Sequence, residues 1–250
     1  MRWSLSCIVL GALVAIPTPA FAGRTFYGWL YGTEVMPERG VELQTWVLER
    51  DSFGPGAMSE KETDLWVGPL VGLTDQLELA LPVEFEWLDS DGTNADFTMR
   101  RYGAELRYRL VSQDPVEAPP IAPLVRIAAK RDVIVRGATI VEADLVASYQ
   151  SGRLHALVDL GGVATLAAAD EGGSHFQARP GAGVSIKVTD TLRLGGELYG
   201  EIDVDDNATR WLAVGPNMAY TQGRFWMSAA YGIGLTGITA APRVMWGVAF

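Results

Sequence analysis

Cysteine and histidine are scarce in this sequence, and their scarcity excludes several classes of protein. The 250 residues contain one cysteine, Cys7, and two histidines, His155 and His175. A disulfide framework is therefore excluded. No cluster of residues has metal-ligand spacing, and no glycine-rich phosphate loop occurs. We expect no metal site, no cofactor and no enzyme activity.

The sequence also lacks an excess of positive charge and, after its first residues, any long apolar run. It has 30 acidic and 20 basic residues and a formal net charge of -10. Without a basic stripe, nucleic acid is not an expected partner. A membrane-spanning helix needs about 18 or more apolar residues in succession. The absence of such a run excludes a helical membrane protein.

The first 22 residues have the layout of a secretory signal peptide. Arg2 precedes an apolar run from Leu5 to Ile16, and two prolines then lead to Ala20-Phe21-Ala22. The run is too short to span a bilayer as a helix, and A-x-A is a typical cleavage site. We predict export and cleavage after Ala22, which also removes Cys7.

The rest of the chain repeats segments of about ten alternating residues, separated by turn residues, as is typical of a transmembrane β-barrel. Short turns and longer polar loops alternate along it, so we expect periplasmic turns and external loops. We predict an all-β fold, a closed antiparallel transmembrane β-barrel of about 12 strands. The strands are expected at 40–50, 63–73, 77–88, 96–111, 121–130, 138–150, 153–166, 176–188, 192–202, 210–221, 224–235 and 242–250.

Three parts of the chain follow from this pattern: a signal peptide at 1–22, an N-terminal segment at 23–39 and the transmembrane barrel at 40–250. The N-terminal segment is rich in aromatic residues, which are unfavourable in water. It has three possible placements. It enters the lumen as a plug, forms an extra partial strand, or remains a periplasmic tail.

The chain ends on RVMWGVAF, an alternating strand that stops at an aromatic residue. One face of this strand carries Val244, Trp246, Val248 and Phe250. An exposed apolar edge would aggregate in water, whereas pairing of the last strand with the first closes the barrel. A terminal aromatic residue also resembles the assembly signal of outer-membrane barrels, so the outer-membrane assembly machinery is an expected partner, beside the lipid bilayer.

The opposite faces of the strands carry charge. Along 77–88, leucines and aromatic residues alternate with Glu78, Glu84 and Glu86. A soluble β-sandwich would alternate as well, with its aromatic residues inside, but twelve long strands with a terminal Phe favour a barrel. The candidate lumen-lining residues are Glu84, Glu86, Arg101, Glu105, Arg107, Arg109, Arg126, Lys130, Glu142, Asp144, Asp159, Arg179, Lys187, Glu197 and Glu201.

Two interpretations of these charges remain open. They form salt bridges that brace the barrel, or they line a pore and orient polar solutes. A turn at 189–191 pairs positions that sum to 380, which places Arg179 opposite Glu201. Small residues on the same face form a second wall, which either borders open space or only relieves crowding. They are Gly181, Gly183, Gly195, Gly215, Ala219, Ala230, Gly232, Gly234 and Gly247.

Several segments resemble the outer-membrane transporters named for the MetA pathway of phenol degradation. They are PERGVELQTWV, VGLTDQLELALPVEF, RRYGAELRYRL, LRLGGELYGE and WLAVGPNMAYTQGRFWMSAAYGIGL. The resemblance implies a closed barrel in the outer membrane, and the family's name implies passage of small, hydrophobic solutes. It brings no catalytic or binding residue with it.

We predict a narrow channel or transporter for small solutes. A structural or adhesive barrel is the alternative, and an outer-membrane lipid hydrolase is a third. The hydrolase is disfavoured because Ser174 and His175 are neighbours, whose side chains point apart on a strand, and because His155 shares a lumen face with Asp159.

Overall fold

The computed structural model describes residues 25–52, 60–90, 96–114, 116–167, 173–204 and 208–250. The predicted signal peptide lies outside these residues. Within them, no helix is long and apolar enough to cross a membrane. The strands are β1 (Val41–Ser52), β2 (Glu60–Gly72), β3 (Leu77–Ala80), β4 (Val83–Ser90), β5 (Asp96–Arg109), β6 (Ile121–Asp132), β7 (Thr139–Ser151), β8 (Leu154–Leu166), β9 (His175–Lys187), β10 (Leu192–Asp203), β11 (Ala208–Gln222), β12 (Phe225–Thr236) and β13 (Ala240–Ala249).

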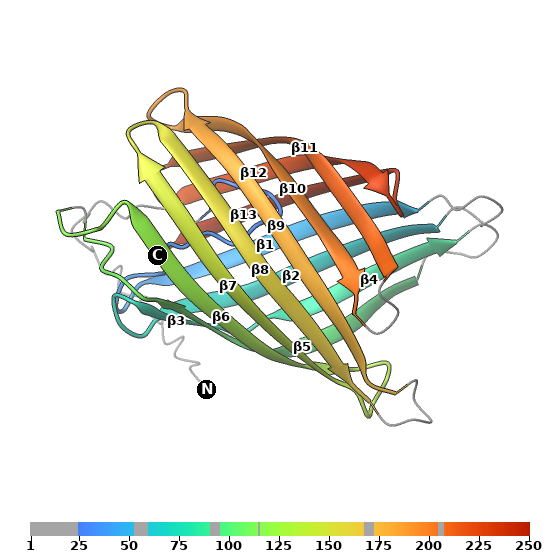
Figure 1. Cartoon of the computed structure of the whole chain (residues 1–250). Helices are drawn as coiled ribbons and strands as arrows, with labels where there is room; N and C mark the ends of the chain where they lie inside the picture. Colours follow the sequence, from blue (N-terminus) through green and yellow to red (C-terminus); the bar gives the residue numbers. More distant parts are fainter. Residues whose placement is uncertain (1–24, 53–59, 91–95, 115, 168–172, 205–207) are drawn as a thin grey trace, which may run out of the picture.

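The strands form one closed antiparallel barrel (Figure 1). Neighbouring strands in the chain pair with each other, except β3 and β4, which each pair with β2 and β5 instead. The first strand, β1, pairs with both β2 and β13. At the closure Trp46 lies between Met245 on β13 and Trp66 on β2. Because β3 and β4 occupy one position between β2 and β5, the barrel has 12 positions. The predicted fold class and strand number are therefore confirmed.

The prediction of one continuous strand at 77–88 was wrong. It is interrupted at Leu81 and Pro82, which separate β3 from β4. Proline has no N–H for the ladder, which explains the break. Residues 81 and 82 remain hydrogen-bonded to the strands on either side. Leu81 N–H donates to Pro69 O at 3.1 Å, and Gly103 N–H donates to Pro82 O at 3.1 Å.

The barrel has two unlike ends. At one end, which we call the turn end, the strands are joined by short connections, except for residues 110–120 between β5 and β6. Two of these are two-residue turns that begin with Gly152 (φ 55°) and Gly223 (φ 59°). Glycine adopts this left-handed conformation without strain, as tight hairpins require. The opposite, loop end carries the connections that follow β1, β4, β6, β8, β10 and β12, most of which are longer.

The surface is inverted relative to a soluble protein. The Arg126 side chain is fully buried inside the barrel, whereas Leu160 on the outer face exposes 64% of its surface. Along β6 the apolar side chains of Ile121 and Ile127 point outward. An apolar band around the whole barrel would aggregate in water but is stable in lipid. This arrangement excludes the soluble β-sandwich.

The last strand closes the sheet as expected from its pattern. Arg243 and Met245 point inward and are buried, whereas Val248 and Phe250 are exposed on the outer face. The backbone N–H of Phe250 donates to Val41 O at 2.9 Å. The chain terminus is thereby bound to the first strand at the turn end.

Candidate functional site: the barrel interior

Residues 25–40, which we call the inner segment, enter the barrel and contact its wall through their backbone (Figure 1). Residues 25–36 are buried or half-buried, whereas residues 37–39 are exposed at the turn end. Glu197 on β10 accepts hydrogen bonds from the N–H groups of Gly28 and Trp29, at 2.8 and 3.0 Å. Glu78 on β3 accepts one from Met36 N–H at 2.6 Å. Wall carboxylates thus satisfy backbone donors that would otherwise be buried without a partner.

Wall residues also donate to the carbonyl oxygens of the inner segment. Arg109 on β5 donates to Thr33 O at 2.9 Å, and Arg243 on β13 donates to Trp29 O at 3.0 Å. Gln113 bonds both backbone groups of Val35, at 3.3 and 3.1 Å. The inner segment is therefore held along its length from several sides of the barrel.

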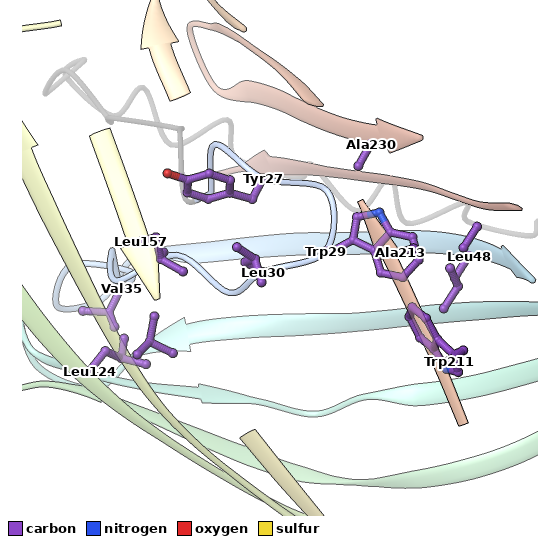
Figure 2. Close-up of a cluster of buried hydrophobic side chains, with 12 residues drawn as sticks. Tyr27, Trp29, Leu30, Val35, Leu48, Leu124, Leu157, Trp211, Ala213 and Ala230 are labelled. Carbon is purple, nitrogen blue, oxygen red and sulfur yellow. The ribbon is translucent and has the colours of Figure 1, made fainter. Parts of the chain in front are cut away.

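Its apolar side chains pack against barrel residues that include Leu157, Trp211 and Ala230 (Figure 2). A Cβ built on Gly183 would lie 2.4 Å from Tyr27 Cε1, and one on Gly232 would lie 2.9 Å from Trp29 Cζ2. The ring of Trp29 is also 5.2 Å from that of Trp211, centroid to centroid. Glycine at these positions makes the space that the aromatic side chains fill.

Near the turn end the inner segment contacts His155 on β8. The Tyr27 hydroxyl lies 2.9 Å from His155 Nδ1, and the Phe26 ring meets the His155 ring edge-on at 4.8 Å. The guanidinium of Arg193 lies over the Phe26 ring at 4.1 Å. These residues bury His155, which is 2% exposed, and place it away from lipid.

A network of ion pairs lies beside the inner segment. Arg126 on β6 contacts Glu105 at 2.6 Å, Glu142 at 2.7 Å and Asp144 at 2.5 Å. Arg107 contacts Glu105 at 2.5 Å. Because each buried charge has an opposite partner, the network can exist in the interior, and loss of one member would leave others unpaired.

The network continues toward the loop end through Glu142. Lys130 contacts both Glu142 and Glu84 at 2.6 Å, and Arg179 contacts Glu142 at 3.1 Å. Tyr31 of the inner segment also contacts the network, because the Arg126 guanidinium lies over its ring, 4.2 Å from the ring centroid. A cation over an aromatic face is attractive, so the inner segment and the network stabilise one another.

An open cavity of about 610 Å³, which we call the vestibule, occupies the loop end of the lumen. Charged, polar and a few apolar side chains line it. They are Arg50, Glu62, Arg100, Arg101, Asp132, Val135, Ala138, Ile140, Glu142, Val163, Thr165, Ala167, Gly173, His175, Gln177, Arg179, Glu201, Trp211, Gly237 and Ile238. A cavity of this volume and polarity suits a small polar solute.

A second cavity of about 340 Å³ lies at the turn end, between the inner segment and the β-turns. Pro37, Asp75, Gln76 and residues 112–114 line it. The charged network and the inner segment lie between this cavity and the vestibule.

Most of the lumen-lining candidates lie inside the barrel. Glu84, Glu105, Arg107, Arg109, Arg126, Lys130, Glu142, Asp144, Asp159 and Glu197 are buried there, and Glu86, Arg101, Arg179 and Glu201 are partly buried near the vestibule. Lys187 instead lies at the turn end, 2.9 Å from Asp190. Its hydrogen bond and charge lower the pKa of Asp190.

The pairing expected for Arg179 was right in backbone register and wrong in side-chain partner. The pairs Gly181–Tyr199 and Ala178–Ile202 place Arg179 level with Glu201. The Arg179 guanidinium nevertheless contacts Glu142 and Asp144, at 3.1 and 3.8 Å. Glu201 accepts a hydrogen bond from Trp211 Nε1 at 2.9 Å.

The sequence analysis assumed strict alternation of inward and outward residues, and it therefore did not predict that Arg100 faces the lumen. Arg100 lies beside Arg101, and both line the vestibule. A register shift between Glu84 and Phe85 marks a β-bulge against β5, and a bulge can turn consecutive residues to the same side. The sequence did contain a sign of this bulge. In a regular strand, one of two adjacent arginines would face lipid, which is unfavourable.

The structure also brings together three carboxylates that the sequence analysis did not group. Ligand atoms of Glu62, Asp64 and Glu86 lie within 4.8 Å of one another. Arg50 contacts Glu62 at 2.6 Å and Asp64 at 2.7 Å. Glu86, the third carboxylate, lies 3.8 Å from Arg100, so all three acids form ion pairs within the vestibule wall.

Several solved outer-membrane proteins have a similar fold. An outer membrane channel from Pseudomonas putida F1 gives a TM-score of 0.58 at 14% sequence identity, covering 87% of this chain and 98% of that chain. The NanC porin gives 0.53 at 10% identity, covering 83% and 98%. The beta domain of the Bordetella autotransporter BrkA gives 0.53 at 10% identity, covering 84% and 99%.

No family model and no curated protein matches the sequence. At these low identities the structural likeness shows the fold. A channel, a porin and an autotransporter domain share that fold, so the function has to be argued from the interior of this barrel.

Proposed function

We propose that this protein is an outer-membrane channel for small solutes that its inner segment holds closed. One observation carries the proposal. A polar vestibule opens at the loop end, a smaller cavity lies at the turn end, and the inner segment with its hydrogen-bonded anchors lies between them. A barrel with only a structural role has no need for a solute-sized polar cavity.

The orientation and processing of the chain are part of the proposal. Residues 1–22 direct export, residues 23–39 supply the plug, and residues 40–250 form the barrel. The loop end faces outward and the turn end faces the periplasm, because outer-membrane barrels have short periplasmic turns. Val244, Trp246, Val248 and Phe250 serve as the signal for the assembly machinery.

The resemblance to transporters named for the MetA pathway supports a role in solute passage, and so do the channel and porin among the structural neighbours. A lipid hydrolase is less well supported. His155 is buried against Tyr27 inside the lumen, and His175 lies in the vestibule, 2.9 Å from Asp203. Neither position meets the acyl chains of the membrane.

Planar-bilayer recording tests the proposal with the full-length protein and a variant that lacks residues 25–36. We expect rare or small openings from the full-length protein and larger, frequent openings from the deletion variant. A gel shift between heated and unheated samples checks that both barrels are folded. Absence of conductance from both folded proteins would favour a sealed structural barrel.

A further inference from the structure

The vestibule contains two adjacent arginines, whose acidic partners Asp132, Glu84 and Glu86 lie 3.2 to 3.8 Å away. Arg100 and Arg101 follow one another on β5, yet both line the cavity, with 26% and 33% of their side-chain surfaces exposed. Consecutive strand residues normally face opposite sides. The bulge opposite Glu84 turns both guanidiniums to the same side.

Their ion pairs are longer than those deeper in the lumen. Among the described residues, the nearest acidic oxygen is 3.2 Å from Arg100 and 3.4 Å from Arg101. Arg126, by contrast, has three carboxylate contacts between 2.5 and 2.7 Å. The two vestibule arginines therefore retain more capacity to bind an added anion than the buried cations do.

The acids closest to the pair are shared with other donors: Glu84 Oε2 and Asp132 Oδ2 contact the arginines, and the second oxygen of each carboxylate is bonded elsewhere. Glu84 Oε1 accepts a hydrogen bond from Lys130 Nζ at 2.6 Å. Asp132 Oδ1 accepts the backbone N–H groups of Ile134 and Val135, both at 2.8 Å. These bonds hold both carboxylates in place and divide them between the arginines and other donors, so neither acid is dedicated to the pair.

We propose that Arg100 and Arg101 form an anion subsite that binds the carboxylate of a small organic acid. Guanidinium groups present a planar fork of donors that matches a carboxylate. Thr165 and Gln177 line the same cavity and offer hydrogen bonds to the rest of the molecule. This inference rests on the proposed function in one respect: it makes small organic acids the solutes of the channel.

Calorimetric titration of the full-length protein, folded in detergent, tests the subsite without requiring conduction. The probes are glucuronate, glucose and glucose 1-phosphate, which share a sugar ring and differ in charge. We expect glucuronate to bind about tenfold or more tightly than glucose, because charged hydrogen bonds are the stronger ones. The affinity should fall as salt is added.

Substitutions test the assignment of residues. Arg100→Gln and Arg101→Gln should each weaken glucuronate binding about tenfold, and the double variant should remove it. Arg101→Lys should retain part of the affinity, since it keeps the charge and loses the fork. Arg153→Gln, at the exposed turn end, is the matched control and should bind as wild type.

Four results would overturn the subsite: equal binding of glucose and glucuronate, unchanged binding in the double variant, equal loss in Arg153→Gln, or binding of glucose 1-phosphate alone. The last would assign the arginines to phosphate instead. Conductance distinguishes this failure from failure of the channel. A protein that conducts without binding glucuronate loses only the subsite, and one that binds without conducting loses only the channel.

Discussion

Glu197 Oε1 accepts a hydrogen bond from the backbone N–H of Gly28 at 2.8 Å, although 169 positions separate the two residues. Glu197 Oε2 accepts a second bond from Trp29 N–H at 3.0 Å. One side chain on β10 therefore fixes a turn of the inner segment in the middle of the lumen. The charged wall binds a part of its own chain as well as bracing the barrel.

Replacement of this carboxylate should release the inner segment. Hydrogen bonds to a charged group contribute roughly 1.5–3 kcal/mol each, so Glu197→Ala should raise the open probability about tenfold or more. Glu197→Gln should have a smaller effect, because its carbonyl oxygen still accepts one bond. Glu49→Ala, on the same barrel and away from the inner segment, is the control. Equal single-channel records for all variants would show that Glu197 does not hold the channel closed.

Crowding the small-residue wall should act on the same segment. Gly183→Ala places a Cβ 2.4 Å from Tyr27 Cε1, whereas at Gly162 the nearest atom is 3.6 Å from the added Cβ. We expect Gly183→Ala to increase conductance and protease access to residues 25–40, and Gly162→Ala to behave as wild type. A Trp at Gly232, where an added Cβ would lie 2.9 Å from Trp29 Cζ2, should displace the segment in the same way.

The strand pattern was predictable because its causes are local. Alternation with period two and turn residues such as Gly152 and Gly223 depend on neighbours in the chain. Pro82 was also visible, and it breaks the third strand. The inner segment has no such periodicity. Its aromatic residues pointed to a buried position, but the carboxylates that hold its backbone come from distant strands.

Side-chain partners inside the lumen were less predictable than backbone register. Arg179 is level with Glu201, but its long side chain reaches Glu142 two strands away. Arg100 faces the interior because of a bulge, whose position depends on how β4 and β5 pair.

The side-chain partner of Arg179 leads to a prediction about stability. Arg179→Glu should lower the unfolding temperature of the barrel by repelling Glu142, and a second change, Glu201→Arg, should not restore it.

The ion-pair network should contribute strongly to stability. Arg126→Met leaves Glu105, Glu142 and Asp144 with fewer cations, and removal of one partner from a buried pair costs about 3–5 kcal/mol. The temperature at which the barrel unfolds on a gel should fall. Arg131→Met, on the same strand with an exposed side chain, should change it little. If Arg126→Met unfolded at the wild-type temperature, the ion-pair network would not brace the barrel.

Cysteine labelling tests the orientation. Asp91, Gly172 and Asp206, which the strand pattern places in external loops, lie outside the described residues, so Arg136 and Arg224 are better sites for labelling. Both arginines are exposed, and they lie at the loop end and the turn end respectively. On intact cells, an impermeant thiol reagent should modify Arg136→Cys and spare Arg224→Cys. The reverse pattern would invert the barrel, and modification of both would contradict a membrane barrel.

The final residue should matter more for assembly than for stability of the finished barrel. Phe250 and Phe225 both expose aromatic rings on the outer face at the turn end, 71% and 37% exposed. Phe225 pairs with Val248 within the sheet, whereas Phe250 ends the chain. If the assembly machinery recognises the terminal aromatic residue, Phe250→Ala should reduce the amount of protein in the outer membrane several-fold, and Phe225→Ala should reduce it less.

Refolding of purified protein into detergent separates the effect on assembly from the effect on stability, because no assembly machinery is present there. Both variants should then unfold at nearly the wild-type temperature. Equal membrane levels of Phe250→Ala and wild type would contradict the assembly role of the chain's last residue.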